Sequence, residues 1–350
     1  MRYQKVVVIT VATALSAALA GCADNKSGSG GAKGADSVTI GLSNQENQNY
    51  LPLILADRLG FFKKQGLDVK VTNMKDPGQV NNAMVNGQID GSVGFYDKTM
   101  DLQAKHKHTQ AVIQLLQAPG MVAMARKGSG VDSPKDYGGK TIGVTGMTGS
   151  TAFLSKYLAV RNGVPDKRIK LSEVAAGPTF VSAFDHKEVD AGTTTEPAIS
   201  SILKKKLGKI IADMRTPAGT KAAVGGPYPG TAMAVRQDWA KDHKATVQKM
   251  VNAMYGSLQW MQTHSAKQIT AKVPADFYKG PGKKAYQQAL ANQMGMFSPN
   301  GQMPTDGPQS VYRVLRKVDP VVKGKKIDLA KTYTDSYVQK AAKEVKPGSK

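Results

Sequence analysis

Hydrophobic and polar positions follow strand-like and helix-like periods in turn along this chain, and the first stretches predict the fold. Residues 38–42 are a short apolar run with β-branched side chains, which is typical of a buried strand. Apolar residues recur at helical spacing over 51–62, and residues 67–71 alternate between apolar and polar like a second strand. A helix between two such strands forms a βαβ unit, which needs a parallel sheet. The polar loop 43–49 follows the first strand, and open parallel sheets bind ligands beyond the carboxyl ends of their strands.

The same succession continues and predicts an α/β protein with two lobes. Further strands are expected at 89–95, 111–116, 121–125, 141–144, 169–174, 189–192, 210–213 and 231–235, and helices at 77–88, 100–104, 153–160, 180–184, 238–264, 286–296 and 309–318. We expect lobe 1 to contain 37–126 and 232–335, lobe 2 to contain 127–231, and 336–350 to be a basic tail that is loose from residue 340 onward. The chain would cross between lobes in the Gly- and Pro-rich stretch 127–140 and again in the strand 231–235. Two crossings permit closure around a ligand by a hinge.

The N-terminal stretch has the pattern of an export signal followed by a tether. After a basic start, residues 6–20 form an apolar run of the length of a signal-peptide core, too short for a comfortable membrane span. The run ends in Leu-Ala-Gly before Cys22, which resembles the lipobox of bacterial lipoproteins, so 1–22 is interpreted as a lipoprotein signal peptide with the lipid on Cys22. An ordinary secretory signal is the alternative. Cys22 is the only cysteine, so no internal disulfide exists. Residues 23–36, rich in Gly, Ser and Ala, are predicted to be a flexible tether.

Residue patterns for catalysis or metal binding are absent from the sequence. His106 and His108 stand between lysines with no carboxylate or thiol close by, which favours a solvated turn over a metal site. Glu196 has no second carboxylate or histidine at a useful spacing, which favours hydrogen bonding or helix capping over acid–base chemistry. The triplet 139–141 (Gly-Lys-Thr) resembles the end of a phosphate-binding loop, but Pro134 occupies the position of the required first glycine. The sequence contains no HExxH, GxSxG or dinucleotide-binding motif. We therefore expect no enzyme, no cofactor and no metal.

The net charge is strongly positive. The chain of 350 residues carries 48 Lys and Arg against 26 Asp and Glu, a formal charge of +22. Lysines are spread along the chain and are not interleaved with aromatic residues as in proteins that stack nucleic-acid bases, so we expect no nucleic-acid partner. A basic surface near an anionic cell envelope is the simpler interpretation, and a surface lipoprotein that binds polyanions is an alternative.

Five motifs, in the same order, resemble those of periplasmic substrate-binding proteins of ABC importers. They are ADRLGFFKKQGLDVKV, VNNAMVNGQIDGSVGF, DYGGKTIGVTGMTGST, AFDHKEVDAGTTTEPAI and GGPYPGTAMAVRQDWAKDH, and the resemblance as a whole covers roughly residues 38–261. The most similar group is the one that binds nitrate, sulfonates, taurine or thiamine-pyrimidine precursors. The resemblance implies a type II periplasmic binding protein fold, with two α/β lobes, a ligand cleft between them and two crossover strands. It also implies a monomer that delivers its ligand to a transporter permease and its ATPase.

The combined prediction is an exported solute-binding lipoprotein, facing the periplasm or the cell surface, that captures a small organic anion or zwitterion, such as a sulfonate or taurine, by lobe closure. Predicted ligand contacts are Ser43, Asn44, Asn47, Phe95, Tyr96, Thr148, Gly149, Ser150, Thr151, Thr179, Thr194, Glu196 and Tyr228. The loop 145–151 suits an anion because it is rich in glycine and hydroxyls and opens a helix, although Ser150 or Thr151 could serve only as a cap.

Three alternatives remain open. A binder of pyrimidine precursors, nitrate or bicarbonate would share the same fold. The polyanion-binding lipoprotein is the second. The third is an enzyme like the fungal thiamine-pyrimidine synthases, which also resemble this chain; those enzymes depend on a cysteine-rich motif, whereas Cys22 is the single cysteine here.

Overall fold

The structure is a computed structural model that describes residues 36–345. The predicted signal peptide with Cys22 and nearly all of the predicted tether lie outside the described residues. Among the residues that the structure describes, none of the helices has the length and apolar character that a membrane span requires.

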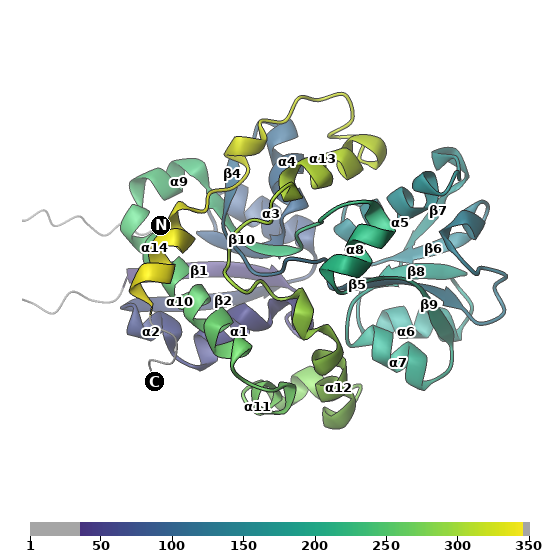
Figure 1. Cartoon of the computed structure of the whole chain (residues 1–350), viewed down its shortest axis with the longest axis horizontal. Helices are drawn as coiled ribbons and strands as arrows, with labels where there is room; N and C mark the ends of the chain where they lie inside the picture. The colour runs from purple at the N-terminus through teal and green to yellow at the C-terminus, as the bar shows by residue number, and fades with distance from the viewer. Residues whose placement is uncertain (1–35, 346–350) are drawn as a thin grey trace, which may run out of the picture. The chain divides into compact units, whose positions relative to one another are not determined.

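Two five-stranded sheets form the centres of two lobes (Figure 1). The first sheet has the order β2 (Leu67–Met74), β1 (Asp36–Ser43), β3 (Gly91–Phe95), β10 (Thr231–Arg236) and β4 (Thr109–Gln114). The second has the order β7 (Lys170–Glu173), β6 (Thr141–Val144), β8 (Ala191–Thr194), β5 (Met121–Arg126) and β9 (Gly208–Met214). Each sheet contains one strand that runs antiparallel to both neighbours, β10 in the first and β5 in the second. The two lobes therefore share one topology.

The opening βαβ unit forms as its periodicity predicts, with one difference. Strands β1 and β2 pair in parallel over their full length, and Leu51, Leu53 and Leu55 are buried under them. The expected single helix is two helices, α1 (Leu51–Arg58) and α2 (Phe61–Lys64), because Gly60 adopts a left-handed φ of 72°. Glycine accepts this conformation without the Cβ clash that other residues meet.

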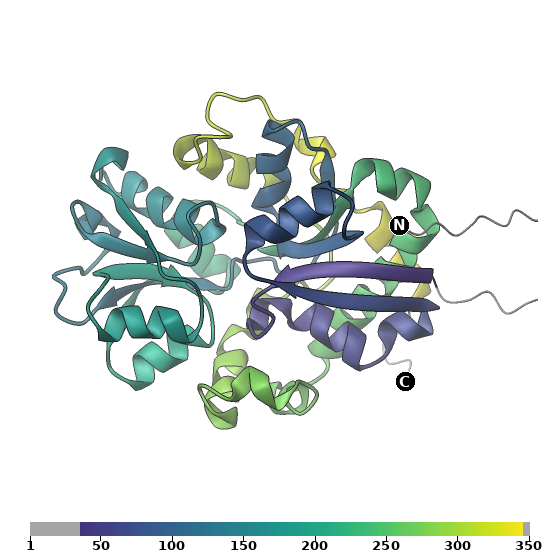
Figure 2. The same cartoon turned by 180° about the vertical axis from the view of Figure 1, so that it is seen from behind.

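Helices cover both faces of each sheet (Figures 1 and 2). The remaining helices are α3 (Pro77–Val85), α4 (Asp97–Ala104), α5 (Ser150–Arg161), α6 (Pro178–Asp185), α7 (Ala198–Lys204), α8 (Pro217–Val224), α9 (Gln237–Asp242), α10 (Lys244–Gln262), α11 (Ala266–Thr270), α12 (Lys283–Gln293), α13 (Gly307–Val318) and α14 (Ser336–Glu344). The methionines of α10, such as Met250 and Met254, are fully buried in the first lobe. A second apolar cluster contains Met100 of α4, Phe153 of α5 and Leu315 of α13, so one core extends from the first lobe into the second.

The first crossing between the lobes lies earlier than the predicted 127–140. Strand β5 pairs with β8 and β9, so it belongs to the second sheet and the chain crosses between Gln114 and Met121. The error arose because an apolar strand carries no sign of the sheet in which it will pair. The return crossing precedes β10, and the two crossings are joined by hydrogen bonds of 2.9 Å from Gly230 N to Leu116 O and 3.0 Å from Leu116 N to Thr231 O.

The predicted tail is wrong for residues 336–344, including residues 340–344, which we expected to be loose. This segment forms α14, which packs on α10 with Val338 and Ala341 fully buried. These two residues are three positions apart and share one helix face, while the lysines around them face outward.

Candidate functional site

A cavity of about 530 Å³ lies between the two lobes. Its walls are the loops that follow β1, β2 and β3 in the first lobe and β6 and β7 in the second. These loops stand at the carboxyl ends of parallel strands, which is where open sheets present polar groups to ligands.

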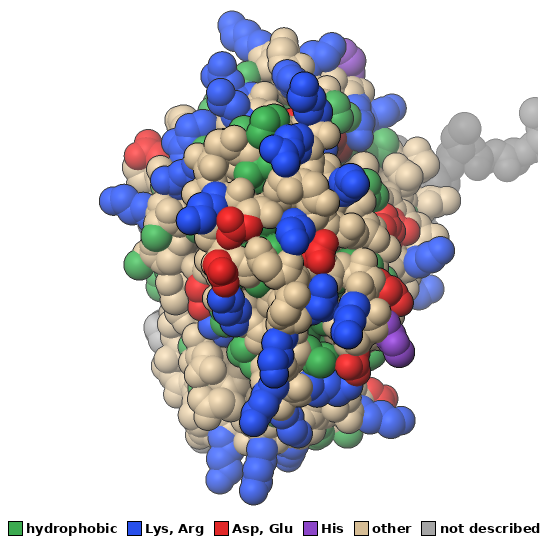
Figure 3. Space-filling model, turned by 90° about the vertical axis from the view of Figure 1, so that its right-hand side faces the viewer, with side chains coloured by type: hydrophobic (Ala, Val, Ile, Leu, Met, Phe, Trp, Pro, Cys, Tyr) green, Lys and Arg blue, Asp and Glu red, His purple; other side chains and the backbone are tan. Residues whose placement is uncertain are grey.

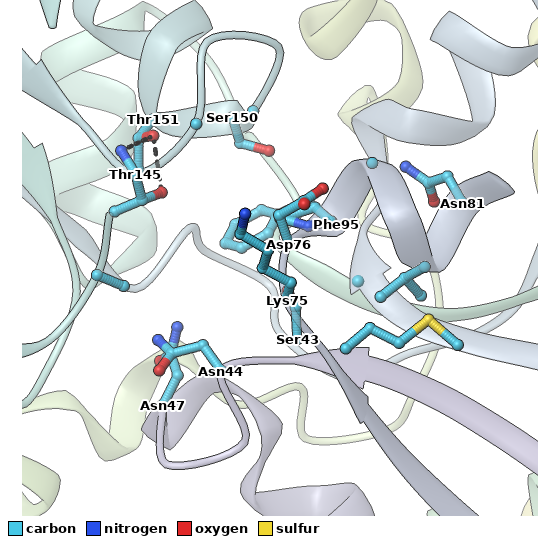
Figure 4. A pocket seen from close by; sticks show the side chains of 18 of the residues that line it. Ser43, Asn44, Asn47, Lys75, Asp76, Asn81, Phe95, Thr145, Ser150 and Thr151 are labelled. Atoms are coloured by element: carbon cyan, nitrogen blue, oxygen red, sulfur yellow. Dashed lines mark hydrogen bonds between the residues drawn. The ribbon is translucent and has the colours of Figure 1, made fainter. Parts of the chain in front are cut away.

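The wall from the first lobe presents amide side chains. Asn44 adopts a positive φ of 56°, which asparagine tolerates better than most residues, and Figure 4 shows its amide and that of Asn47 directed to the same side of the cavity. Asn47 Oδ1 also accepts a hydrogen bond of 3.0 Å from Asn49 N, which orders the short helical turn Gln48–Tyr50. Ser43 ends β1 and is buried at the cavity wall.

The wall from the second lobe is the loop 145–151, in which two hydroxyls have different roles. Thr151 Oγ1 accepts a hydrogen bond of 3.1 Å from Thr145 N and lies 3.0 Å from Thr145 Oγ1, so it holds the loop together. Ser150 is 5% exposed, its Oγ has no hydrogen-bond partner among the described residues, and it points into the cavity (Figure 4). The residue before α5 is Gly149, which has no side chain to cap the helix. Ser150 is therefore available to a ligand. The backbone amides of Ser150 and Thr151 have no backbone acceptor among the described residues, whereas those of Ala152 and Phe153 donate to Gly149 O.

Eight of the predicted contact residues line this cavity and five do not. The eight are Ser43, Asn44, Asn47, Phe95, Thr148, Gly149, Ser150 and Thr151. The five whose side chains lie elsewhere are Tyr96, Thr179, Thr194, Glu196 and Tyr228.

The two tyrosines belong to the core. Tyr228 is fully buried and its hydroxyl donates a 2.8 Å hydrogen bond to Asp97 Oδ2, and burial raises the pKa of Tyr228 well above its ordinary value. The Tyr96 hydroxyl pairs with the Thr332 hydroxyl, and its ring meets Tyr333 edge-on at 6.5 Å. Both rings pack against helices that arrive from distant parts of the chain, which a local pattern does not reveal.

The other three residues, Thr179, Thr194 and Glu196, also lie outside the cavity wall. Glu196 is 1% exposed and accepts two hydrogen bonds of 3.0 Å from Ser200, as the capping interpretation expected. Burial raises the pKa of Glu196 above its ordinary value. Thr194 is buried within β8 and Thr179 is exposed on α6, whereas Thr195, one residue further along, reaches the cavity.

The family of the chain follows from a match that covers most of both lobes. Residues 47–267 match the family described as NMT1/THI5 like. The chain belongs to the NMT1/THI5-like family. It is 25% identical over 231 residues to the putative binding protein YtlA of Bacillus subtilis (strain 168), a match that covers 65% of this chain and 67% of YtlA. It is 30% identical over 177 residues to the 4-amino-5-hydroxymethyl-2-methylpyrimidine phosphate synthase THI11 of Saccharomyces cerevisiae, and that match spans 50% of each chain.

Solved structures place this NMT1/THI5-like protein in the predicted fold. A structure from Bordetella bronchiseptica RB50 is 29% identical with a TM-score of 0.82 and covers 88% of this chain and 97% of its own. The periplasmic nitrate-binding protein NrtA from Synechocystis PCC 6803 is 14% identical with a TM-score of 0.68 and covers 89% of each chain. The putative sulfonate ABC transporter, periplasmic sulfonate-binding protein SsuA from Methylobacillus flagellatus KT is 16% identical with a TM-score of 0.65, covering 90% of this chain and 96% of its own. The likeness to NrtA and SsuA shows the fold, which is that of periplasmic binding proteins, and the predicted family resemblance is confirmed.

Sequence reasoning missed a third loop of this family member, the one that follows β2. It brings Lys75 and Asp76 to the cavity, next to Asn73 at the end of β2. A signal for it existed, because β1 and β2 were expected to be parallel neighbours whose carboxyl ends meet at one edge. Asp76 Oδ1 also accepts a 2.9 Å hydrogen bond from Gln79 N and so caps α3.

Charged side chains of both signs line the cavity of this family member. The carboxylates are Glu46, Asp76 and Glu173, and the lysines are Lys75 and Lys98. Glu173 Oε2 accepts a 3.1 Å hydrogen bond from Met147 N, so it supports the loop 145–151. Lys98, also missed from the sequence, is 8% exposed, whereas Lys75 is exposed. Among residues 36–345, no group of three or more His, Cys, Asp or Glu side chains is placed to hold a metal ion.

Proposed function

We propose that this protein is the solute-binding component of an ABC importer and that it captures a small organic anion or zwitterion between its lobes. The observation that carries the proposal is the cavity of about 530 Å³, into which each lobe directs polar groups that the described residues leave available. Such a volume lies within the range of small-molecule sites. The names of YtlA, NrtA and SsuA as binding proteins support the proposal.

In this proposal the ligand is bound non-covalently and is not chemically changed. The amides of Asn44 and Asn47 and the hydroxyl of Ser43 bind its polar atoms from the first lobe, and Phe95 covers its body. Thr148, Gly149, Ser150 and Thr151 receive an anionic group from the second lobe, because the unpaired amides and positive end of α5 favour negative charge there. The cavity walls among the described residues contain neither histidine nor cysteine, the side chains that most often act as base or nucleophile.

An aminopyrimidine is the second candidate ligand. Asn44, Asn47 and Asn73 together with Glu46 and Asp76 offer donors and acceptors that suit a ring with exocyclic amino groups. THI11 is named a pyrimidine phosphate synthase, and the match to this chain covers 50% of its length. A protein that only binds an aminopyrimidine would use these same cavity residues. To assign a synthase, an experiment would also have to detect formation of a product.

We further propose export as a lipoprotein with the lipid on Cys22, a monomeric state, and delivery to a permease with its ATPase. The alternative of a polyanion-binding surface protein has less support from the charge distribution. Figure 3 shows lysines and arginines over the whole end of the second lobe, with carboxylates among them in the middle of that face.

A thermal-shift panel tests the binding function. The chain from Ala23 onward, which retains every described residue, is mixed at physiological salt with taurine, alkane- and arylsulfonates, nitrate, bicarbonate, aminopyrimidines and aromatic acids. Ligand at 100 times its dissociation constant adds about 2.7 kcal/mol to the free energy of unfolding and raises the melting temperature. A shift with one chemical class identifies the substrate. Salt-sensitive binding to heparin with no small-molecule shift would replace the proposal by the polyanion alternative. Ser150→Ala/Thr151→Ala binding an anionic hit unchanged would refute the assignment of the anion to α5.

A further inference from the structure

Lys98 is the buried cation of the cavity wall, and it reaches from one lobe to the other. It stands in the first turn of α4 in the first lobe and is 8% exposed. Its Nζ donates to Thr148 O, and it lies 4.4 Å from the centre of the Phe153 ring; both residues belong to the second lobe. The side chain also lines the cavity.

Within the described residues no carboxylate forms an ion pair with Lys98. The neighbouring acids have other partners for one oxygen each: Asp97 accepts from Tyr228 at 2.8 Å, Asp101 pairs with Lys105 at 2.9 Å, and Asp319 accepts from Val321 N at 2.9 Å. The second oxygens of Asp97 and Asp319 are buried without a hydrogen-bond partner among the described residues. Lys98 acts on Asp319 only as a charge at longer range. Burying an ammonium group without a directly paired carboxylate is costly, and a carbonyl, one ring face and a carboxylate at longer range compensate only part of that cost.

The remaining donors of Lys98 therefore define a site for negative charge. An ammonium group has three donors, and Thr148 O accepts from one of them. Across the cavity wall, Ser150 is 5% exposed with an unpartnered hydroxyl directed into the same space, at the start of α5. Two buried donors from opposite lobes thus face one cavity and share Thr148 as their neighbour.

We propose that Lys98 is the first lobe's half of a clamp for an oxyanion of the ligand, a carboxylate or sulfonate, and that it determines the preference for a negative charge. The assignment rests on the proposed binding function and extends it. The oxyanion receives a charge-assisted hydrogen bond from Lys98 and hydrogen bonds from Ser150 and the first amides of α5. Because its donors come from both lobes, binding of the oxyanion favours the closed arrangement.

Matched ligand pairs test the clamp. Dissociation constants are measured by calorimetry for butanesulfonate and butanesulfonamide, taurine and its sulfonamide, and benzoate and benzamide. We expect the wild-type chain from Ala23 to prefer the anion of at least one pair by about tenfold or more, and Lys98→Met to reduce that preference by about 10- to 100-fold. Lys98→Arg should keep most of it. Lys156→Met removes an equal charge from α5 outside the cavity wall and should leave the preference unchanged.

The outcomes separate the clamp from the binding function. If Lys98→Met keeps the wild-type preference, Lys98 is only a strut between the lobes and the inference is overturned. If the wild type binds neutral members as tightly as the anions, the clamp is wrong while the binding function stands. If the protein binds none of these ligands and no compound of the thermal-shift panel, both the binding function and the clamp are contradicted. Should Lys98→Met fail to fold, Ser150→Ala repeats the test from the other lobe: a preference reduced by about three- to tenfold supports the shared site, and an unchanged one overturns it.

Discussion

Hydroxyl side chains have different roles in this protein, depending on whether each has a hydrogen-bond partner. Thr151 holds a loop, whereas its neighbour Ser150 has no partner and faces the cavity. Tyr228 has a buried carboxylate partner, whereas the Tyr137 hydroxyl is buried without any among the described residues. The energetic consequence of removing a hydroxyl therefore differs from site to site.

Tyr228→Phe is expected to destabilise the protein by about 1–3 kcal/mol, because Asp97 then loses the donor of its buried oxygen. Asp97 Oδ1 already lacks a partner among the described residues, so nothing nearby replaces the hydroxyl. Urea unfolding measures the change, with Tyr137→Phe as the matched control that should be neutral or slightly stabilising. Ligand affinity should not change, because Tyr228 lies outside the cavity wall; weaker binding at full stability would contradict the placement.

Glu196 should make stability fall with rising pH. Burial raises the pKa of Glu196 above its ordinary value of 4.5, despite the hydrogen bonds from Ser200 and the charge of Arg215. Above pH 4.5 the folded state then holds a proton that the unfolded state has released, so this group's contribution decreases as the pH rises through the raised pKa. In Glu196→Gln the contribution is absent. Urea unfolding across this pH range should show the variant gaining stability relative to the wild type, and parallel pH profiles would refute the shift.

At the level of elements, helices from distant parts of the chain join the lobes and cover them. Helix α13 packs against α4 of the first lobe and α5 of the second, and α14 covers α10 (Figure 1). Because α14 buries Val338 and Ala341, the C-terminal part of the described chain contributes to the core.

Val338→Ala is expected to destabilise the protein by about 1–3 kcal/mol through the cavity that it leaves. Lys340→Ala on the same helix is the control: its side chain is 61% exposed, and such surface changes usually stay within about 0.5 kcal/mol. Both are compared by urea unfolding. Equal, small effects would mean that α14 does not stabilise the fold.

On the scale of the whole molecule, two crossings connect lobes that each provide half of the site. The crossings are hydrogen-bonded to each other at Gly230 and Leu116, and a Cβ on Gly230 would meet Ala118 O at 2.5 Å. Such tightly paired segments suit a hinge about which the lobes move as rigid bodies.

Ligand should reduce the radius of gyration of the protein, because contacts to both lobes favour their approach. Small-angle X-ray scattering on the chain from Ala23, with and without the panel compound that raises the melting temperature most, measures the change. In Lys98→Met the ligand-induced decrease in the radius of gyration should be smaller than in the wild type. An unchanged radius of gyration on saturation would show that capture proceeds without closure.

Much of the fold and part of the site followed from the sequence, because both depend on local periodicity. The alternation of strands and helices located all ten described strands to within a few residues, and loops after parallel strands identified Ser43, Asn44, Asn47 and Ser150 as cavity residues. Strand direction alone places such loops at one edge of a sheet.

The tertiary structure decided what depends on residues far apart. The pairing of β5 with β8 and β9 set the boundary of the lobes. Tyr228 is buried in the core, where its hydroxyl donates a hydrogen bond to Asp97. Likewise Lys98 has the sequence context of an ordinary helical lysine. Only the tertiary structure places it against Thr148 and the Phe153 ring of the other lobe. The exposure of a charged group is set by every element around it, and most of those elements are distant in sequence.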